Sequence, residues 1–177
     1  MANSSPKYSL GDKIVHRSYG IGKIDAIERK PLNGIEAECF KVKTENGHYW
    51  FPTENLDNPR IHPVASQELI ERMIEILRSA PIDLEIDHLQ WKEQIDSVQR
   101  DGDILDISTL IRDLAVLKIT GKLNRTQDQA LKNLEKRLLR EWAASIGVEV
   151  NSIRPRFQTY LKESKAYFQK GNQNEKK

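Results

Sequence analysis

The chain has 177 residues, 38% of them hydrophobic and 31% charged, which suits one compact domain or two small ones and excludes a large multidomain enzyme. Its single cysteine, Cys39, excludes an internal disulfide framework and a cysteine-based zinc site, as expected in a reducing compartment. No segment resembles a signal peptide or approaches the ~18 consecutive apolar residues that cross a bilayer. We therefore expect a soluble cytoplasmic protein with no membrane partner.

The net charge of +2 is divided unevenly along the chain. Residues 1–63 carry 9 basic and 8 acidic side chains, residues 64–117 carry 5 and 12, and residues 118–177 carry 14 and 6. The basic excess near the C-terminus indicates an anionic partner, or neutralisation by acidic groups within the fold. Charge alone leaves both possibilities open.

The first sixty residues contain short β-branched runs punctuated by glycine and proline. Strands are predicted over residues 13–17, 22–28, 38–44 and 48–51, and Asn46-Gly47 predicts a two-residue hairpin turn between the last two. Because a flat sheet of this size would expose its edges and half of its apolar face, we expect four or five strands in a curled, partly closed barrel.

From Ser66 onward the apolar spacing becomes helical. Helices are predicted over residues 67–80, 87–100 and 104–120, the first capped by Ser66 and the third by Asp103. A fourth should begin at Thr126, with Gln129 completing a capping box, and a fifth near Asn151.

The expected fold class is α+β. An SH3-like or Tudor-like β-barrel should occupy residues 1–63, a compact all-helical domain residues 64–170, and a disordered tail residues 171–177.

A search for catalytic chemistry finds little. His16, His48, His62 and His88 lie on separate segments, without the i, i+4 spacing of a helical metal site. The Walker phosphate-loop pattern is absent. Cys39 is expected to be a small packing residue. We therefore expect a binding protein, not an enzyme, with no cofactor and no metal.

Three tryptophans give further information. Trp142 shares a helical stripe with Leu134 and Leu138 and should be buried. Trp50 and a neighbouring ring must point to opposite faces of a strand, so one large ring should be exposed. Trp91 lies among polar residues, and the sequence leaves open whether it is a core residue or a solvent-facing wedge.

Two ordered sets of motifs resemble the CarD/CdnL family of bacterial transcription regulators, whose N-terminal module also occurs in transcription-repair coupling factors. The first set is Tyr8, Gly11-Asp12, Ile14-Val15-His16, Tyr19-Gly20, Gly22, Ile24, Ile27-Glu28, Gly34, Phe40, Val42, Phe51-Pro52 and Glu54-Asn55. The second set is Asp101-Gly102-Asp103, Leu110-Ile111-Arg112-Asp113-Leu114, Lys122-Leu123-Asn124 and Leu139-Arg140-Glu141.

The resemblance implies that the barrel docks on the β subunit of RNA polymerase while the helical domain contacts promoter DNA and stabilises the open complex. The docking candidates that it implies are Arg29, Lys30, Trp50, Phe51, Pro52, Glu54 and Asn55. Trp50 stands where many family members have a basic residue.

For DNA, the resemblance makes Trp91 the wedge candidate, although Lys92 is followed by acids where the family usually has arginines. The cationic candidates are Lys118, Lys122, Arg125, Lys132, Arg154, Arg156, Lys162 and Lys165. A rival hypothesis is a protein-only adaptor whose helical domain binds a sigma factor or another regulator. In either case we expect a monomer.

Overall fold

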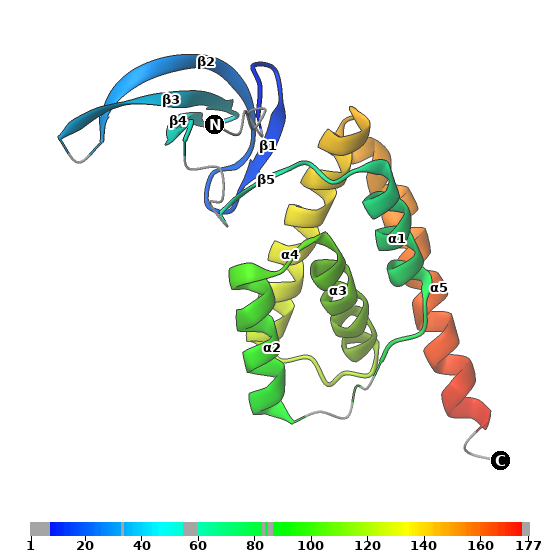
Figure 1. Ribbon diagram of the computed structural model, residues 1–177. Coiled ribbons are helices and arrows are strands. Elements are labelled where there is room, and N and C mark those ends of the chain that lie inside the picture. The colour runs from blue at the N-terminus through cyan, green and yellow to red at the C-terminus, as the bar shows by residue number, and fades with distance from the viewer. Residues whose placement is uncertain (1–7, 33, 55–59, 83, 85–86, 175–177) are drawn as a thin grey trace, which may run out of the picture. The chain divides into compact units, whose positions relative to one another are not determined.

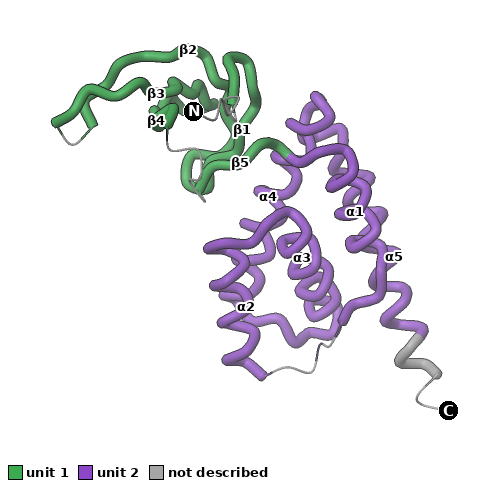
Figure 2. The backbone as a smooth tube through the Cα atoms, in the orientation of Figure 1, with its two compact units in different colours: residues 1–64 green, residues 65–177 purple. Residues whose placement is uncertain are grey.

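The computed structural model describes residues 8–32, 34–54, 60–82, 84 and 87–174, with only the backbone described for residues 171–174. The chain divides into two compact units, residues 1–64 and residues 65–177 (Figure 2). The expected boundary lay one residue earlier. Each unit has its own hydrophobic core.

The N-terminal unit is a five-stranded antiparallel sheet (Figure 1). The strands are β1 (Lys13–His16), β2 (Gly20–Leu32), β3 (Ile35–Thr44), β4 (Gly47–Pro52) and β5 (Ile61–Pro63), in the order β4-β3-β2-β1-β5. The four predicted runs correspond to β1–β4. A shift of register between Ile24 and Ala26 marks a bulge in the long β2–β3 pair.

The sheet is not closed into a barrel, so the predicted SH3-like or Tudor-like barrel is not confirmed. Among the described strands, β4 pairs with β3 alone and β5 pairs with β1 alone. Tyr8 links the two ends of the sheet, because its ring packs edge-on against Phe51 of β4 at 5.9 Å and its hydroxyl donates to the Ile61 carbonyl of β5 at 3.3 Å. Side chains therefore cover the concave core without a closing ladder of backbone bonds.

The hairpin between β3 and β4 is confirmed, but its turn lies one residue earlier than predicted. Thr44 pairs with Gly47, so Glu45 and Asn46 are the two turn residues. Gly47 is the first residue of β4, at a φ of 145°, a conformation that glycine adopts without a steric penalty.

The C-terminal unit consists of five helices. They are α1 (Gln67–Arg78), α2 (His88–Asp101), α3 (Ile104–Ile119), α4 (Arg125–Ile146) and α5 (Val150–Asn174). Ser66 and Asp103 accept hydrogen bonds from first-turn amides, which confirms both predicted caps. None of the described helices is long and apolar enough to cross a membrane.

Two predicted helix ends differ from the structure. Helix α4 is capped by Asn124 with Gln127 as the reciprocal partner, in place of the predicted Thr126 and Gln129. Asn124 is an equally good cap two residues earlier, so the longer helix gains further backbone bonds. Helix α5 continues to Asn174, into the segment predicted to be disordered, while residues 175–177 lie outside the described part.

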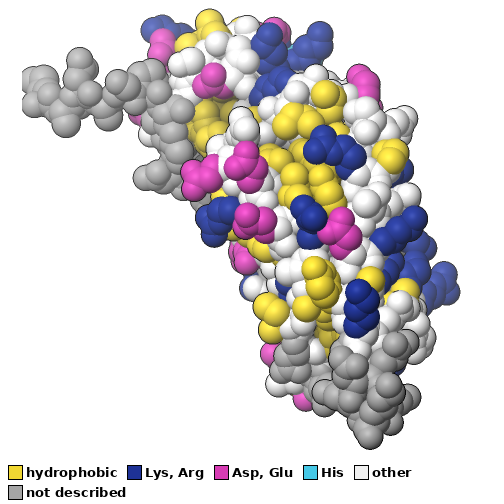
Figure 3. Space-filling view, turned by 90° about the vertical axis from the view of Figure 1, so that its right-hand side faces the viewer, with side chains coloured by type: hydrophobic (Ala, Val, Ile, Leu, Met, Phe, Trp, Pro, Cys, Tyr) yellow, Lys and Arg dark blue, Asp and Glu magenta, His cyan; other side chains and the backbone are white. Residues whose placement is uncertain are grey.

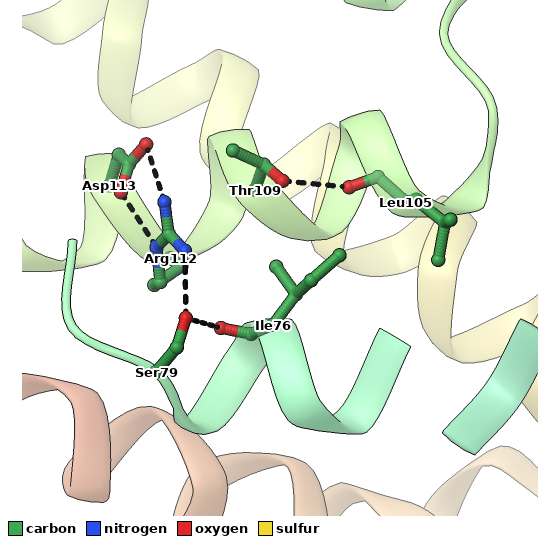
Figure 4. A network of polar contacts seen from close by, with 6 residues as sticks. All are labelled: Ile76, Ser79, Leu105, Thr109, Arg112 and Asp113. Carbon is green, nitrogen blue, oxygen red and sulfur yellow. Dashed lines mark hydrogen bonds and ion pairs between the residues drawn. The ribbon is translucent and has the colours of Figure 1, made fainter. Parts of the chain in front are cut away.

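Helix α3 is the centre of the helical unit, and it buries an ion pair of neighbouring residues. Arg112 and Asp113 are 2% and 5% exposed, and the guanidinium donates to the carboxylate through Nε at 2.8 Å and Nη2 at 3.2 Å (Figure 4). Arg112 Nη1 also donates to the Ser79 hydroxyl at 2.8 Å, and the Ile82 amide donates to Asp113. The pair thus holds the segment after α1 against helix α3.

Burial raises the pKa of the Asp113 carboxyl, and the hydrogen bond and charge of Arg112 act in the opposite direction. The loss of hydration is therefore the larger effect for this carboxylate. Removing one partner would leave an uncompensated buried charge, which costs much more than the intact pair contributes.

We predict that Asp113→Ala lowers the free energy of unfolding of the helical unit by about 3–5 kcal/mol, because Arg112 loses its buried partner. Urea unfolding followed by far-ultraviolet circular dichroism measures this change. The control is Asp101→Ala, which removes the exposed partner of Arg100 at 2.7 Å and should cost at most about 1 kcal/mol. Equal losses in the two variants would contradict the assigned role of the buried pair.

Candidate interaction surfaces

Strand β4 presents one large aromatic ring to solvent. Tyr49 and Phe51 are 7% and 4% exposed and belong to the core, whereas Trp50 between them is 39% exposed. Because successive side chains of a strand point to opposite faces, burying the two outer rings forces Trp50 onto the other face. The prediction of one exposed ring is thus confirmed, and the ring is that of Trp50.

Glu28 of β2 fixes the Trp50 ring in place. The indole Nε1–H donates to Glu28 Oε2 at 3.0 Å, and Lys30 Nζ lies 3.2 Å from the same oxygen. Lys41 Nζ donates to Glu28 Oε1 at 2.9 Å. Lys30 Nζ also lies 4.5 Å from the centre of the Trp50 ring, within the range of a cation–π interaction.

These contacts lower the pKa of the Glu28 carboxyl to about 2, with the hydrogen bond from Lys41 as the largest cause, followed by those from Trp50 and Lys30. The bond to Glu28 also raises the pKa of Lys41. Glu28 is therefore ionised at neutral pH and accepts bonds from three strands. We call Glu28, Lys30, Lys41 and Trp50 the Trp50 cluster.

The structure brings together only part of the docking candidates. Lys30, Trp50 and Pro52 share the face of the sheet that carries the Trp50 cluster. Arg29 is exposed on the opposite face, since it neighbours Lys30 in the same strand. Phe51 is a core residue and cannot offer its ring to a partner.

Glu54 is exposed just beyond β4, and Asn55 lies outside the described residues. Glu28 was missed as a site residue by sequence reasoning. Its spacing of two from Lys30 was the available signal, because residues i and i+2 of a strand share a face.

Apolar side chains extend this face along the β2–β3 ribbon. Leu32 and Ile35 pair in register and are 36% and 74% exposed. Both lie on the side of the Trp50 cluster, because Leu32 is two residues from Lys30. The face thus adds exposed apolar area to the Trp50 ring, and exposed apolar patches mark interaction sites.

Trp91 is a core residue of the helical unit, not a solvent-facing wedge. Its side chain is 5% exposed and belongs to the same core as Ile95, one helical turn later. Leu89 of the same helix is 61% exposed. The structure therefore favours the core alternative that the sequence left open, and a wedge role for Trp91 stays an untested prediction.

Several cationic candidates are already paired within the helical unit. Lys118 and Lys132 each lie 2.6 Å from Asp128, and both lower the pKa of that carboxyl. Burial raises the pKa of the Glu135 carboxyl, and the nearby charges of Lys118, Lys165 and Arg154 act in the opposite direction. Acidic groups within the helical unit thus neutralise part of the C-terminal basic excess, which was one of the two possibilities that the charge distribution left open.

The remaining cationic candidates differ in exposure and contacts. Arg156 lies 5.9 Å from the Trp142 ring, and Trp142 is 1% exposed, which confirms its predicted core position. Lys122 and Arg125 line two neighbouring hollows between α2 and the start of α4. Lys162 is exposed on α5. The candidates do not converge on a single enclosed site.

Figure 3 looks onto the face of the helical unit formed by α1 and α5. Hydrophobic side chains lie there among separate basic and acidic ones, with a denser group of Lys and Arg along one margin. In the part of the chain that the structure describes, no group of three or more His, Cys, Asp or Glu side chains could hold a metal ion.

Comparison with known proteins gives a consistent class. Residues 8–65 match the protein family described as the CarD-like/TRCF RID domain, so the resemblance found in the sequence is confirmed for the N-terminal unit. The chain is also 24% identical over 153 residues to a Bacillus subtilis (strain 168) protein named "Putative transcription factor YdeB", covering 83% of this chain and 97% of that protein. The sheet and its Trp50 cluster thus lie within the part of the chain that matches this domain family.

We predict that Trp91→Ala destabilises the helical unit by about 3–5 kcal/mol, because truncating a buried aromatic ring leaves a cavity. Trp91→Phe should recover most of this loss and leave the lifetime of promoter complexes unchanged. Thermal unfolding and a promoter-complex decay assay measure the two effects. A shortened lifetime in the stably folded Trp91→Phe protein would support the wedge hypothesis.

Proposed function

We propose that the protein is a cytoplasmic transcription regulator that docks on the β subunit of RNA polymerase and stabilises promoter open complexes through its helical unit. The match of residues 8–65 to polymerase-interacting domains supports the choice of partner. Stabilisation requires no catalysis. A protein that binds one promoter state more tightly than another shifts the equilibrium between them.

The observation that carries the proposal is the Trp50 cluster. Trp50 is the kind of residue that dominates interface energetics, and its indole is already held by Glu28 at 3.0 Å. A ring that is held before binding loses little side-chain entropy on docking. Among the described strands, the outer edge of β4 beside it has no partner and offers backbone groups for strand addition by the polymerase.

For the helical unit we propose contacts between cationic side chains and DNA phosphates. Arg154 and Lys162 suit this role, because both are exposed on α5 and neither has a hydrogen bond or an ion pair among the described residues, although the charge of Arg154 also acts on Glu135. Lys118 and Lys132 would first have to leave Asp128, so their contribution is smaller. Phosphate contacts position a protein on DNA without reading its sequence.

We predict that Trp50→Ala weakens binding of the intact chain to the polymerase β subunit by roughly 30-fold, the loss typical of a central aromatic residue. Glu28→Ala should weaken binding in the same direction but less, because the ring remains and only its position is released. Biolayer interferometry with the purified β subunit measures both affinities.

Tyr167→Ala is the matched control, since it removes a ring that is 57% exposed on α5. It should leave the affinity for the β subunit unchanged. Wild-type affinity in the Trp50→Ala protein would contradict the docking role of the Trp50 cluster.

We predict that Arg154→Gln/Lys162→Gln reduces the slope of log K against log salt for promoter binding by about 2, since each lost phosphate contact contributes roughly 0.9. Arg72→Gln/Arg100→Gln removes the same charge from α1 and α2 and serves as the control. Fluorescence anisotropy at several salt concentrations gives the slopes. Identical slopes for wild type and the α5 variant would exclude these contacts.

A protein-only adaptor is the second candidate function. It is favoured by the burial of Trp91 and by the pairing of Lys118 and Lys132 with Asp128, which leave less of the helical unit for DNA. In this case the helical unit binds a sigma factor or another regulator. Salt-independent retention on polymerase–promoter complexes would support the adaptor over the DNA-binding function.

A further inference from the structure

Three lysines stand in one line across the outer face of the N-terminal sheet. Lys13 of β1 pairs in register with Lys23 of β2, and Lys23 pairs with Lys43 of β3. His48 of β4 is the register partner of Lys43 and continues the line. All four side chains are exposed. We call Lys13, Lys23 and Lys43 the lysine row.

The core determines that the row faces outward. Each lysine is the chain neighbour of a fully buried residue of the sheet, namely Ile14, Ile24 or Val42, which are 0%, 1% and 0% exposed. A slip of one residue would bury the three lysines and expose these three apolar side chains. The row is therefore held on a rigid scaffold, with adjacent lysine backbones about 4.8 Å apart.

Like charges directly opposite each other on neighbouring strands destabilise a sheet. The Lys23–Lys43 pair is of this kind, and in the described part of the chain neither of these two lysines forms an ion pair, whereas Lys13 has a contact of its own. Two acids of β2 have contacts elsewhere, since Glu28 binds Lys30 and Lys41, and the charge of Asp25 raises the pKa of Lys41. Repulsion of this kind is relieved by an anionic ligand.

We propose that the lysine row binds the sugar–phosphate backbone of duplex DNA, as a contact of the N-terminal unit that is separate from those of the helical unit. A line of flexible point charges about 10 Å long matches successive phosphates, and duplex DNA presents a phosphate charge every ~1.7 Å of helix axis. The row does not use the Trp50 cluster, so the proposal goes beyond the docking role and does not depend on it.

The neighbouring aromatic ring favours a duplex over a single strand. Single-stranded nucleic acids are held by bases stacked on free aromatic faces. Lys30 lies 4.5 Å from the centre of the Trp50 ring and Glu28 accepts the indole N–H, so this ring is already engaged. The surface therefore offers charges for a backbone, and the Trp50 ring beside them is already held by Glu28 and Lys30.

The test compares full-length Lys23→Gln/Lys43→Gln with wild type in binding a fluorescent duplex of about 20 base pairs at several salt concentrations. We expect roughly tenfold weaker binding near 0.1 M salt and a slope smaller by about 2. Lys23→Arg/Lys43→Arg keeps the charges and should bind as wild type does. Arg29→Gln removes a cation from the opposite face and should have little effect.

Two further measurements separate the proposal from its alternatives. The Gln variant should bind the polymerase β subunit as wild type does, and its melting temperature should rise, because the repulsion across β2 is removed. Lost β-subunit binding with unchanged DNA affinity would assign the row to an acidic protein segment and overturn the proposal. A lowered melting temperature would do the same, because the lysines would then be stabilising the fold.

Discussion

Burial of one face of the N-terminal sheet is the constraint on which the functional surface of this protein depends. Tyr49, Phe51, Phe40, Val42, Ile24 and Ile14 fill the core from four strands. Because strand side chains alternate, each of these residues fixes its neighbours on the outer face. Trp50 and the lysines on that face are therefore placed by the hydrophobic core, and their positions cannot shift without unfolding the sheet.

Hydrogen bonds and ion pairs to one carboxylate arrange the side chains of the Trp50 cluster on the outer face. A single carboxylate, Glu28, accepts bonds from Lys41, Trp50 and Lys30 and remains ionised at neutral pH because its pKa is lowered to about 2. Salt bridges of exposed groups contribute little to stability on their own. Here the contacts of Glu28 fix the position of a side chain, since they hold the Trp50 ring in one orientation on β4, the last of the described strands in the sheet order.

Much of this organisation could be predicted from the sequence, because it follows from local rules. The α+β order, the exposed ring at Trp50 and the caps at Ser66 and Asp103 required only periodicity and capping chemistry. Local rules could not show whether the sheet closes into a barrel or whether Trp91 is buried. Closure depends on whether β4 and β5 meet, and burial of Trp91 depends on helices distant in the chain.

The family-like motif around α3 shows a related limit of sequence reading. Arg112 and Asp113 contributed to the resemblance, and such charged residues in a regulator of transcription invite a functional interpretation. In the structure they are buried and bind each other and Ser79. They join the segment after α1 to helix α3. These two residues of the motif therefore stabilise the fold and do not form a contact surface.

The central claim is that the face carrying the Trp50 cluster meets RNA polymerase. Ala37 and Glu38 are adjacent in β3, and Ala37 pairs with Lys30 whereas Glu38 pairs with Arg29 on the opposite face. A photo-crosslinking residue placed at position 37 or 38 of the full chain therefore compares the two faces on polymerase–promoter complexes. The account predicts crosslinks to the β subunit from position 37 and none from position 38. Crosslinks from position 38 alone would contradict it.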